Sequence, residues 1–116
     1  MAGPLRILVV EDEMTIALLI EDMLNELGHE VVGLAMRLAP AVECARTCAM
    51  DFAILEVNLD GKTSFSVADI LRARGLPFAF ATGYGPSGIE SRFADCPVLK
   101  KPFDIAMLKA ALPPAG

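Results

Sequence analysis

The chain alternates between two patterns of apolar residues. Residues 5–10 form a continuous, β-branched run of strand length, which is typical of a parallel strand covered on both faces. From Glu13 the period changes, because apolar residues recur every three or four positions until Gly28, a common helix stop. The apolar stripe of this segment consists of Ala17, Ile20, Leu24 and Leu27. A strand followed by an amphipathic helix is therefore expected.

The alternation continues to the end of the chain. Further strands are expected at residues 31–35, 52–57, 77–81 and 97–100, and further helices near 40–49, 67–71 and 104–112. Asp104 is a suitable cap for the last helix, which Pro113 and Pro114 would stop. Glycine or proline at positions 83, 85, 86 and 88 leaves room for only a short fourth helix, in a segment that we expect to be mobile.

Five strands alternating with five helices in one small chain indicate an α/β, doubly wound parallel sheet. Each parallel crossover needs a helix and takes the right-handed path. In such sheets ligands bind at the carboxyl ends of the strands, near the point where the winding reverses.

Composition narrows the possible functions. The 116 residues, 54% of them hydrophobic, fit a single domain over residues 1–116 with no effector domain. A net charge of −5, with no basic cluster larger than Lys100-Lys101, argues against nucleic acid binding. Without a run of roughly 18–20 apolar residues or a secretion signal, we expect no membrane binding and a cytoplasmic location. Cys44, Cys48 and Cys96 are expected to be free thiols, since they lack a disulfide or metal framework.

Polar residues follow four of the predicted strands: Glu11 and Asp12, Glu56, Thr82 and Lys101. Each alone could be a helix cap or a solvated loop residue, but the carboxyl ends of parallel strands meet at one edge. Three clustered carboxylates repel one another by roughly 4 kcal/mol per close pair at an effective dielectric near 20, so a positive group is needed there. Mg²⁺ and the Lys101 ammonium meet that need.

A carboxylate, a divalent cation, a lysine and a threonine hydroxyl together neutralise and orient the oxygens of a phosphoryl group. The sequence therefore predicts phosphoryl chemistry centred on Glu56. Other chemistries have less support: His29, the single histidine, lies in a turn far from the strand ends. There is also no glycine-rich nucleotide motif.

Four segments, ILVVEDE, ILEVNLDG, FATG and KKPF, resemble in order and spacing the receiver domains of two-component response regulators. The resemblance covers essentially the whole chain. It implies a flavodoxin-like (βα)5 sandwich with strand order 2-1-3-4-5. It also implies Mg²⁺ bound by Glu11 or Asp12, with Glu56 and the backbone carbonyl of Asn58, and Lys101 on the phosphoryl oxygens. Thr82 would be the switch hydroxyl, and the peptide bond between Lys101 and Pro102 would be cis.

The segment PFAFATGYG further resembles stand-alone receivers nicknamed for a Phe-Ala-Thr-Gly motif, found in alphaproteobacterial stress-response signalling. A lone receiver implies a monomer or weak dimer in a phosphorelay. Its output would be contact with a histidine kinase, a histidine phosphotransferase protein or another response regulator.

Glu56 departs from the family, whose phosphoacceptor is aspartate. The extra C–C bond displaces the carboxylate by about 1.5 Å, and a misplacement of about 1 Å can cost on the order of a hundredfold in rate. Glu also carries about −1 charge, against about −2 for a phosphoryl group. We therefore expect a natural or engineered phosphomimic that acts by binding and is not an enzyme.

Val98 is a second departure, because many receivers place an aromatic residue there that moves with the switch hydroxyl. Tyr84 is a candidate for that readout, although an ordinary loop tyrosine would look the same. On the first helix, Met14, Leu18 and Leu19 lie outside the core stripe, so they either dock a partner helix or pack on neighbouring helices. Met107 and Leu108 on the last helix are candidates to extend that surface.

Two alternatives keep the same fold. One is a pseudo-receiver interaction domain without metal or phosphate chemistry. The other is a Mg²⁺-dependent phosphohydrolase, which has less support because that class needs a second acid where Asn58 occurs.

Overall fold

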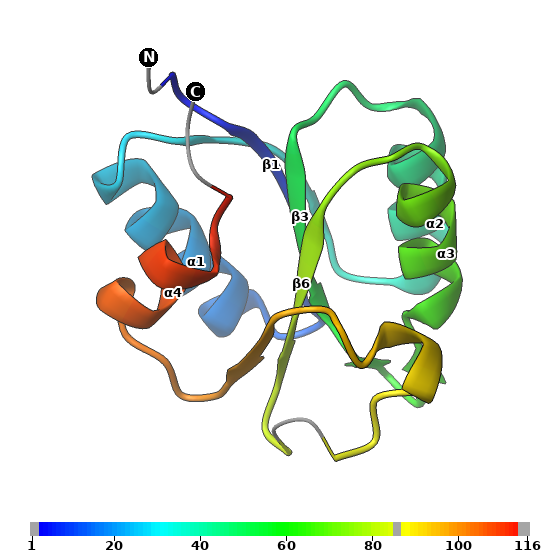
Figure 1. Cartoon of the computed structure of the whole chain (residues 1–116). Coiled ribbons are helices and arrows are strands. Elements are labelled where there is room, and N and C mark those ends of the chain that lie inside the picture. The colour runs from blue at the N-terminus through cyan, green and yellow to red at the C-terminus, as the bar shows by residue number, and fades with distance from the viewer. Residues whose placement is uncertain (1–2, 85–86, 114–116) are drawn as a thin grey trace.

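Five parallel strands form the central sheet of the computed structural model, which describes residues 3–84 and 87–113 (Figure 1). They are β1 (Arg6–Val10), β2 (Glu30–Ala35), β3 (Phe52–Glu56), β6 (Phe78–Thr82) and β7 (Val98–Lys100). Their spatial order is β2-β1-β3-β6-β7. This confirms the predicted α/β flavodoxin-like fold and, counted along the sheet's own strands, the order 2-1-3-4-5.

Four α-helices cover the two faces of the sheet (Figure 1). Helices α1 (Met14–Glu26) and α4 (Ile105–Ala111) lie on one face, and α2 (Leu38–Thr47) and α3 (Phe65–Ala73) lie on the other. Alternate residues of β1 enter the two layers, so that Ile7 packs with Ile20 of α1 whereas Leu8 packs with Ala41 of α2. None of the described helices combines the length and apolar character that crossing a bilayer requires.

In place of the predicted fourth helix, the described residues of this segment form a single 3-10 turn, η1 (Ser91–Phe93), so the expectation of five helices is wrong for the part of the chain that the structure describes. Phe93 is fully buried and stacks with Phe65, at 5.6 Å between ring centroids, and edge-on to Phe80 at 5.5 Å. Arg72 donates a hydrogen bond to the Arg92 carbonyl oxygen at 2.6 Å. Tertiary contacts therefore hold the segment without a helix. Gly85, Pro86 and Pro114, which we expected to break helices here and at the end, lie outside the described residues.

A small antiparallel hairpin follows β3 and was not expected. It pairs β4 (Asn58–Leu59) with β5 (Lys62–Thr63) across a two-residue turn. The turn residues Asp60 and Gly61 have φ of 52° and 85°, the positive values that a hairpin turn of this kind requires and that Asp-Gly favours. The strand predicted over residues 52–57 consequently ends at Glu56.

The cysteines differ from the expectation of three free thiols. Cys44 and Cys48 form a disulfide at the end of α2, whereas Cys96 is free. One helical turn brings the two Cα atoms to 4.9 Å, within the range that a disulfide spans. The prediction of free thiols is therefore wrong for this pair.

Candidate functional site

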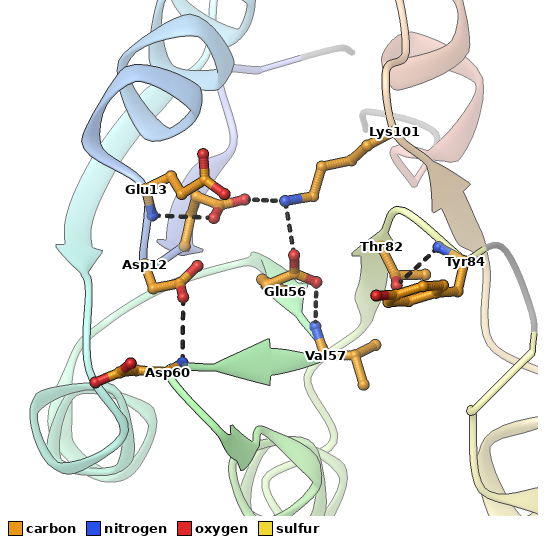
Figure 2. A network of polar contacts seen from close by, with 9 residues as sticks. Asp12, Glu13, Glu56, Val57, Asp60, Thr82, Tyr84 and Lys101 are labelled. Atoms are coloured by element: carbon orange, nitrogen blue, oxygen red, sulfur yellow. Dashed lines mark hydrogen bonds and ion pairs between the residues drawn. The ribbon is translucent and has the colours of Figure 1, made fainter.

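The ends of four strands bring the predicted polar residues to one edge of the sheet (Figure 2). The register is level there, since Val10 pairs with Leu55, Glu56 with Ala81, and Thr82 with Lys100. Residues just beyond these pairs consequently face a common space.

Three carboxylates meet at this edge, and we call Glu11, Asp12 and Glu56 the acid cluster. Each offers one oxygen, and these oxygens lie within 4.8 Å of one another. Glu11 is only 1% exposed, while Asp12 and Glu56 are half-buried. The sequence-predicted carboxylates are therefore brought together as expected.

Lys101 supplies the positive charge that the cluster needs. Its Nζ donates to Glu11 Oε1 at 2.5 Å and forms an ion pair with Glu56 Oε1 at 2.7 Å. Burial lowers the pKa of Lys101, but the hydrogen bonds and charges of the two glutamates outweigh it, so that the pKa is raised overall. Burial raises the pKa of Glu11, although Lys101 and the Glu13 N–H act in the opposite direction. Lys101 is therefore protonated and binds both carboxylates.

The second oxygen of Glu56 turns back to its own backbone. Oε2 accepts a hydrogen bond from the Val57 N–H at 2.6 Å (Figure 2). Together with the Lys101 contact, this engages both oxygens of Glu56. The carboxylate is held at the strand end by groups of the protein itself.

Asp12 and Asn58 both accept hydrogen bonds from the turn of the hairpin. Asp12 Oδ2 accepts the Asp60 N–H at 3.1 Å, and Asn58 Oδ1 accepts the Gly61 N–H at 2.9 Å. The Asn58 side chain is thus occupied within the hairpin, which leaves its backbone carbonyl as the group that the resemblance assigns to a metal.

The donor set fits Mg²⁺. Three carboxylates and one ammonium carry a summed charge of −2, which one divalent cation balances. Carboxylate and carbonyl oxygens are also the hard ligands that Mg²⁺ prefers.

Thr82 lies beside the acid cluster but is bonded elsewhere. Its Oγ1 accepts the Tyr84 N–H at 3.2 Å, and its carbonyl oxygen accepts the Lys101 N–H at 2.8 Å. Tyr84 is 78% exposed, and the half-buried Val98 packs against the core layer of α2 and α3. Between the described residues, Thr82 has no hydrogen bond to Glu56.

An exposed apolar face lies on α1 next to the acid cluster. Met14, Leu18 and Leu19 are 50%, 46% and 53% exposed, so none of them is buried against a neighbouring helix. Met107 is also exposed, whereas Leu108 is fully buried and does not extend the face.

A groove of about 310 Å³ separates α1 from the segment after β7. The sequence did not predict this groove. It is lined by Leu19 of the exposed face, by Lys101, and by Ile16, Ile20, Met23, Pro102 and Phe103. The Lys101–Pro102 peptide bond that shapes this segment is cis, as the resemblance implied. In the sequence, the phenylalanine of the KKPF segment, Phe103, was the one indication of an apolar side chain opposite α1.

No family model matches the chain, but known proteins do. The solution structure of SdrG from Sphingomonas melonis Fr1 is 43% identical and superposes with a TM-score of 0.85, covering 96% of this chain and 95% of SdrG. The BeF3-activated conformation of SdrG gives a TM-score of 0.78 over the same shares at 41% identity. The response regulator REC domain of Erythrobacter litoralis PhyR is 27% identical with a TM-score of 0.80, covering 94% of this chain and 87% of that one.

A curated relative extends the comparison to a longer protein. The transcriptional regulatory protein PdtaR of Mycobacterium tuberculosis is 32% identical in an alignment of 115 positions that covers 96% of this chain and 56% of PdtaR. The chain thus spans about half the length of that relative.

Proposed function

The chain belongs to the receiver domains of response regulators, and we propose that it signals in a phosphorelay by binding another protein. Glu56 occupies the position of the phosphoacceptor aspartate in this proposal. The observation that carries it is the contact of Lys101 with both Glu11 and Glu56, because it joins the ends of three strands around one charged centre.

Glu56 is proposed to prevent phosphoryl transfer. The carboxylate lies about one C–C bond further from the strand than an aspartate would place it. Both of its oxygens are engaged, one by Lys101 and one by the Val57 N–H. A nucleophile with that displacement and those contacts is poorly aligned for in-line attack on phosphorus.

Mg²⁺ is the cofactor we propose for this site, as receiver domains generally bind it at their acidic residues. Glu11, Asp12, Glu56 and the backbone carbonyl of Asn58 would hold the ion. When bound, the ion neutralises and orients the oxygens of a phosphoryl group. Lys101 already balances part of the cluster's charge, so this chain's own residues keep the site assembled.

Two interpretations of Glu56, a phosphomimic and a block to switching, predict different partner binding. As a phosphomimic, Glu56 would present a charge of about −1 near the place of a phosphoryl group, and the partner would bind without phosphorylation. The Thr82 hydroxyl, bound to the Tyr84 N–H instead of Glu56, favours a second candidate, a resting receiver that Glu56 prevents from switching.

The exposed face of α1 is the proposed partner surface. Met14, Leu18 and Leu19 lie beside the acid cluster, and the groove between α1 and Phe103 can accept apolar side chains of a helix. A helical histidine kinase or phosphotransferase protein, or another response regulator, is the proposed partner. Contact at this face would bring a phosphohistidine to the strand ends.

The test compares the chain with Glu56→Asp. Each is incubated with acetyl phosphate and Mg²⁺, and intact mass reports the added phosphoryl group. We expect labelling of Glu56→Asp and none of the parent; stoichiometric labelling of the parent would refute the proposed block. The absence of labelling in both would support the pseudo-receiver alternative, in which metal and phosphate chemistry are lost.

Measurements of partner binding then distinguish the two interpretations of Glu56. The parent, Glu56→Asp, and Glu56→Asp with beryllofluoride are tested against candidate kinases and phosphotransferase proteins by calorimetry. A phosphomimic binds like the beryllofluoride complex, whereas a resting receiver binds like untreated Glu56→Asp. Glu56→Gln, which removes the charge at nearly constant shape, is the control for the role of the carboxylate.

A further inference from the structure

The β4–β5 hairpin connects two parts of the proposed metal site. Asp60 and Gly61 both have positive φ, which few residue types adopt without strain. Leu59 is buried and anchors the hairpin to the core, and the Ser64 N–H donates to the Val57 carbonyl oxygen at 2.8 Å to close its base. The turn is therefore held in one conformation from both ends.

Two backbone donors of this turn point at residues assigned to the metal. The Asp60 N–H donates to Asp12 Oδ2, and the Gly61 N–H donates to Asn58 Oδ1. Figure 2 shows the Asp60 carboxylate turned away from Asp12, so it is the backbone of Asp60 that contacts the acid cluster. The half-buried Asp12 carboxylate is oriented by a group 48 residues away in sequence.

We propose that the Asp60-Gly61 turn is a positioning element that orients the Asp12 carboxylate for a divalent cation. The inference deepens the proposed function and rests on its metal site. Donors that orient ligands in this way affect affinity strongly, since removing such a partner typically weakens metal binding by about 10–100-fold. We expect the lower end, about tenfold, because the turn acts on the Asp12 carboxylate through one hydrogen bond.

Gly61→Ala tests the turn, and Gly28→Ala is its matched control. Gly61 and Gly28 have φ of +85° and +86°, and a Cβ at either would meet nothing within 4 Å. Both substitutions therefore strain the backbone equally without a clash, but Gly28 lies at the end of α1, away from the acid cluster. MgCl₂ is titrated into each ¹⁵N-labelled protein, and the amide shifts of residues 11, 12 and 58 give the dissociation constant.

Gly61→Ala should bind Mg²⁺ about tenfold more weakly than the parent, and Gly28→Ala should match the parent. Equal affinity of Gly61→Ala and the parent, or equal weakening by both substitutions, would overturn the proposal. A second, charge-matched pair covers the case in which Gly61→Ala does not fold. Asp60→Asn, which tolerates positive φ, should retain affinity, and the β-branched Asp60→Val should lose it.

Hydrogen exchange of the Asp60 amide tests the same contact without metal. The parent and Gly28→Ala should protect this amide, whereas Gly61→Ala and Asp12→Ala should not. If the parent binds no Mg²⁺, the metal part of the proposed function fails. The exchange result then decides only whether the turn holds Asp12: loss of protection in both variants supports that contact, and retained protection contradicts it.

Discussion

Replacing Lys101 with Met removes the single ammonium that contacts two carboxylates of the acid cluster among the described residues. The side chain of Lys101 is 14% exposed and that of Glu11 1%, so little solvent is available to replace the lost contacts. Removing one partner of a buried ion pair typically costs about 3–5 kcal/mol. Because Glu56 keeps its hydrogen bond from the Val57 N–H, we expect the lower end, about 3 kcal/mol at neutral pH.

The pH dependence of this loss follows from Glu11. Burial raises its pKa, and Lys101 is among the groups that oppose the rise, so Lys101→Met should raise the pKa further. Consider a carboxyl group whose pKa is higher in the folded protein than in the unfolded protein, where it is about 4.3. Its contribution to stability is fully present at pH values below the unfolded pKa. That contribution is lost as pH rises through the folded pKa. The variant should therefore lose less stability at about pH 5 than at about pH 7.

Urea unfolding followed by far-ultraviolet circular dichroism measures both differences. Lys100→Met, a substitution of the exposed neighbouring lysine, is the control and should change the unfolding free energy by less than about 0.5 kcal/mol. Glu11→Gln combined with Lys101→Met should recover part of the loss, since no buried charge then lacks a partner at that pair. A loss below about 1 kcal/mol at neutral pH, or an equal loss at both pH values, would refute the assigned contacts.

Three further predictions concern the rest of the molecule. Phe93→Ala should cost about 3–5 kcal/mol in urea unfolding, because its buried ring anchors η1, and a cost near 1 kcal/mol would contradict that role. Hydrogen bonds from Arg6 lower the pKa of Asp51, so this carboxylate adds stability above about pH 4 that is lost as pH falls through its folded pKa. The melting temperatures of Asp51→Asn and the parent should accordingly converge in acid, and a constant gap would be inconsistent. Leu19→Glu should abolish partner binding in calorimetry with little change in unfolding free energy. The control Ser66→Glu, on α3, should bind the partner normally.

Local patterns predicted the elements well where the deciding contacts are local. The three-and-four spacing on α1 identified Ala17, Ile20 and Leu24, which are buried. The same reasoning failed between β6 and β7, where Phe93 packs against Phe65 and Phe80, each more than ten residues away in the chain. Packing of that ring, and not helix propensity, shapes the segment.

Two misses have different causes. The Asp60-Gly61 pair is a local hairpin signal that the sequence contains, but no hairpin was predicted between the strand at 52–57 and the helix near 67–71. The Cys44–Cys48 disulfide, in contrast, depends on the rotamers of two side chains on one helix turn. Composition alone does not report those rotamers, and the odd number of cysteines pointed away from pairing.

By itself, the sequence determined the fold class and which residues end the strands, because strand length, helix period and turn residues are properties of short segments. Only the tertiary structure decided that Lys101 binds Glu11, 90 residues away, as well as Glu56. It also decided that Glu56 folds back to Val57, and that Leu108 is buried while Leu18 is exposed. These outcomes depend on the register of neighbouring strands and on how the helices pack on the sheet. Both are determined by contacts between segments that are distant in the sequence.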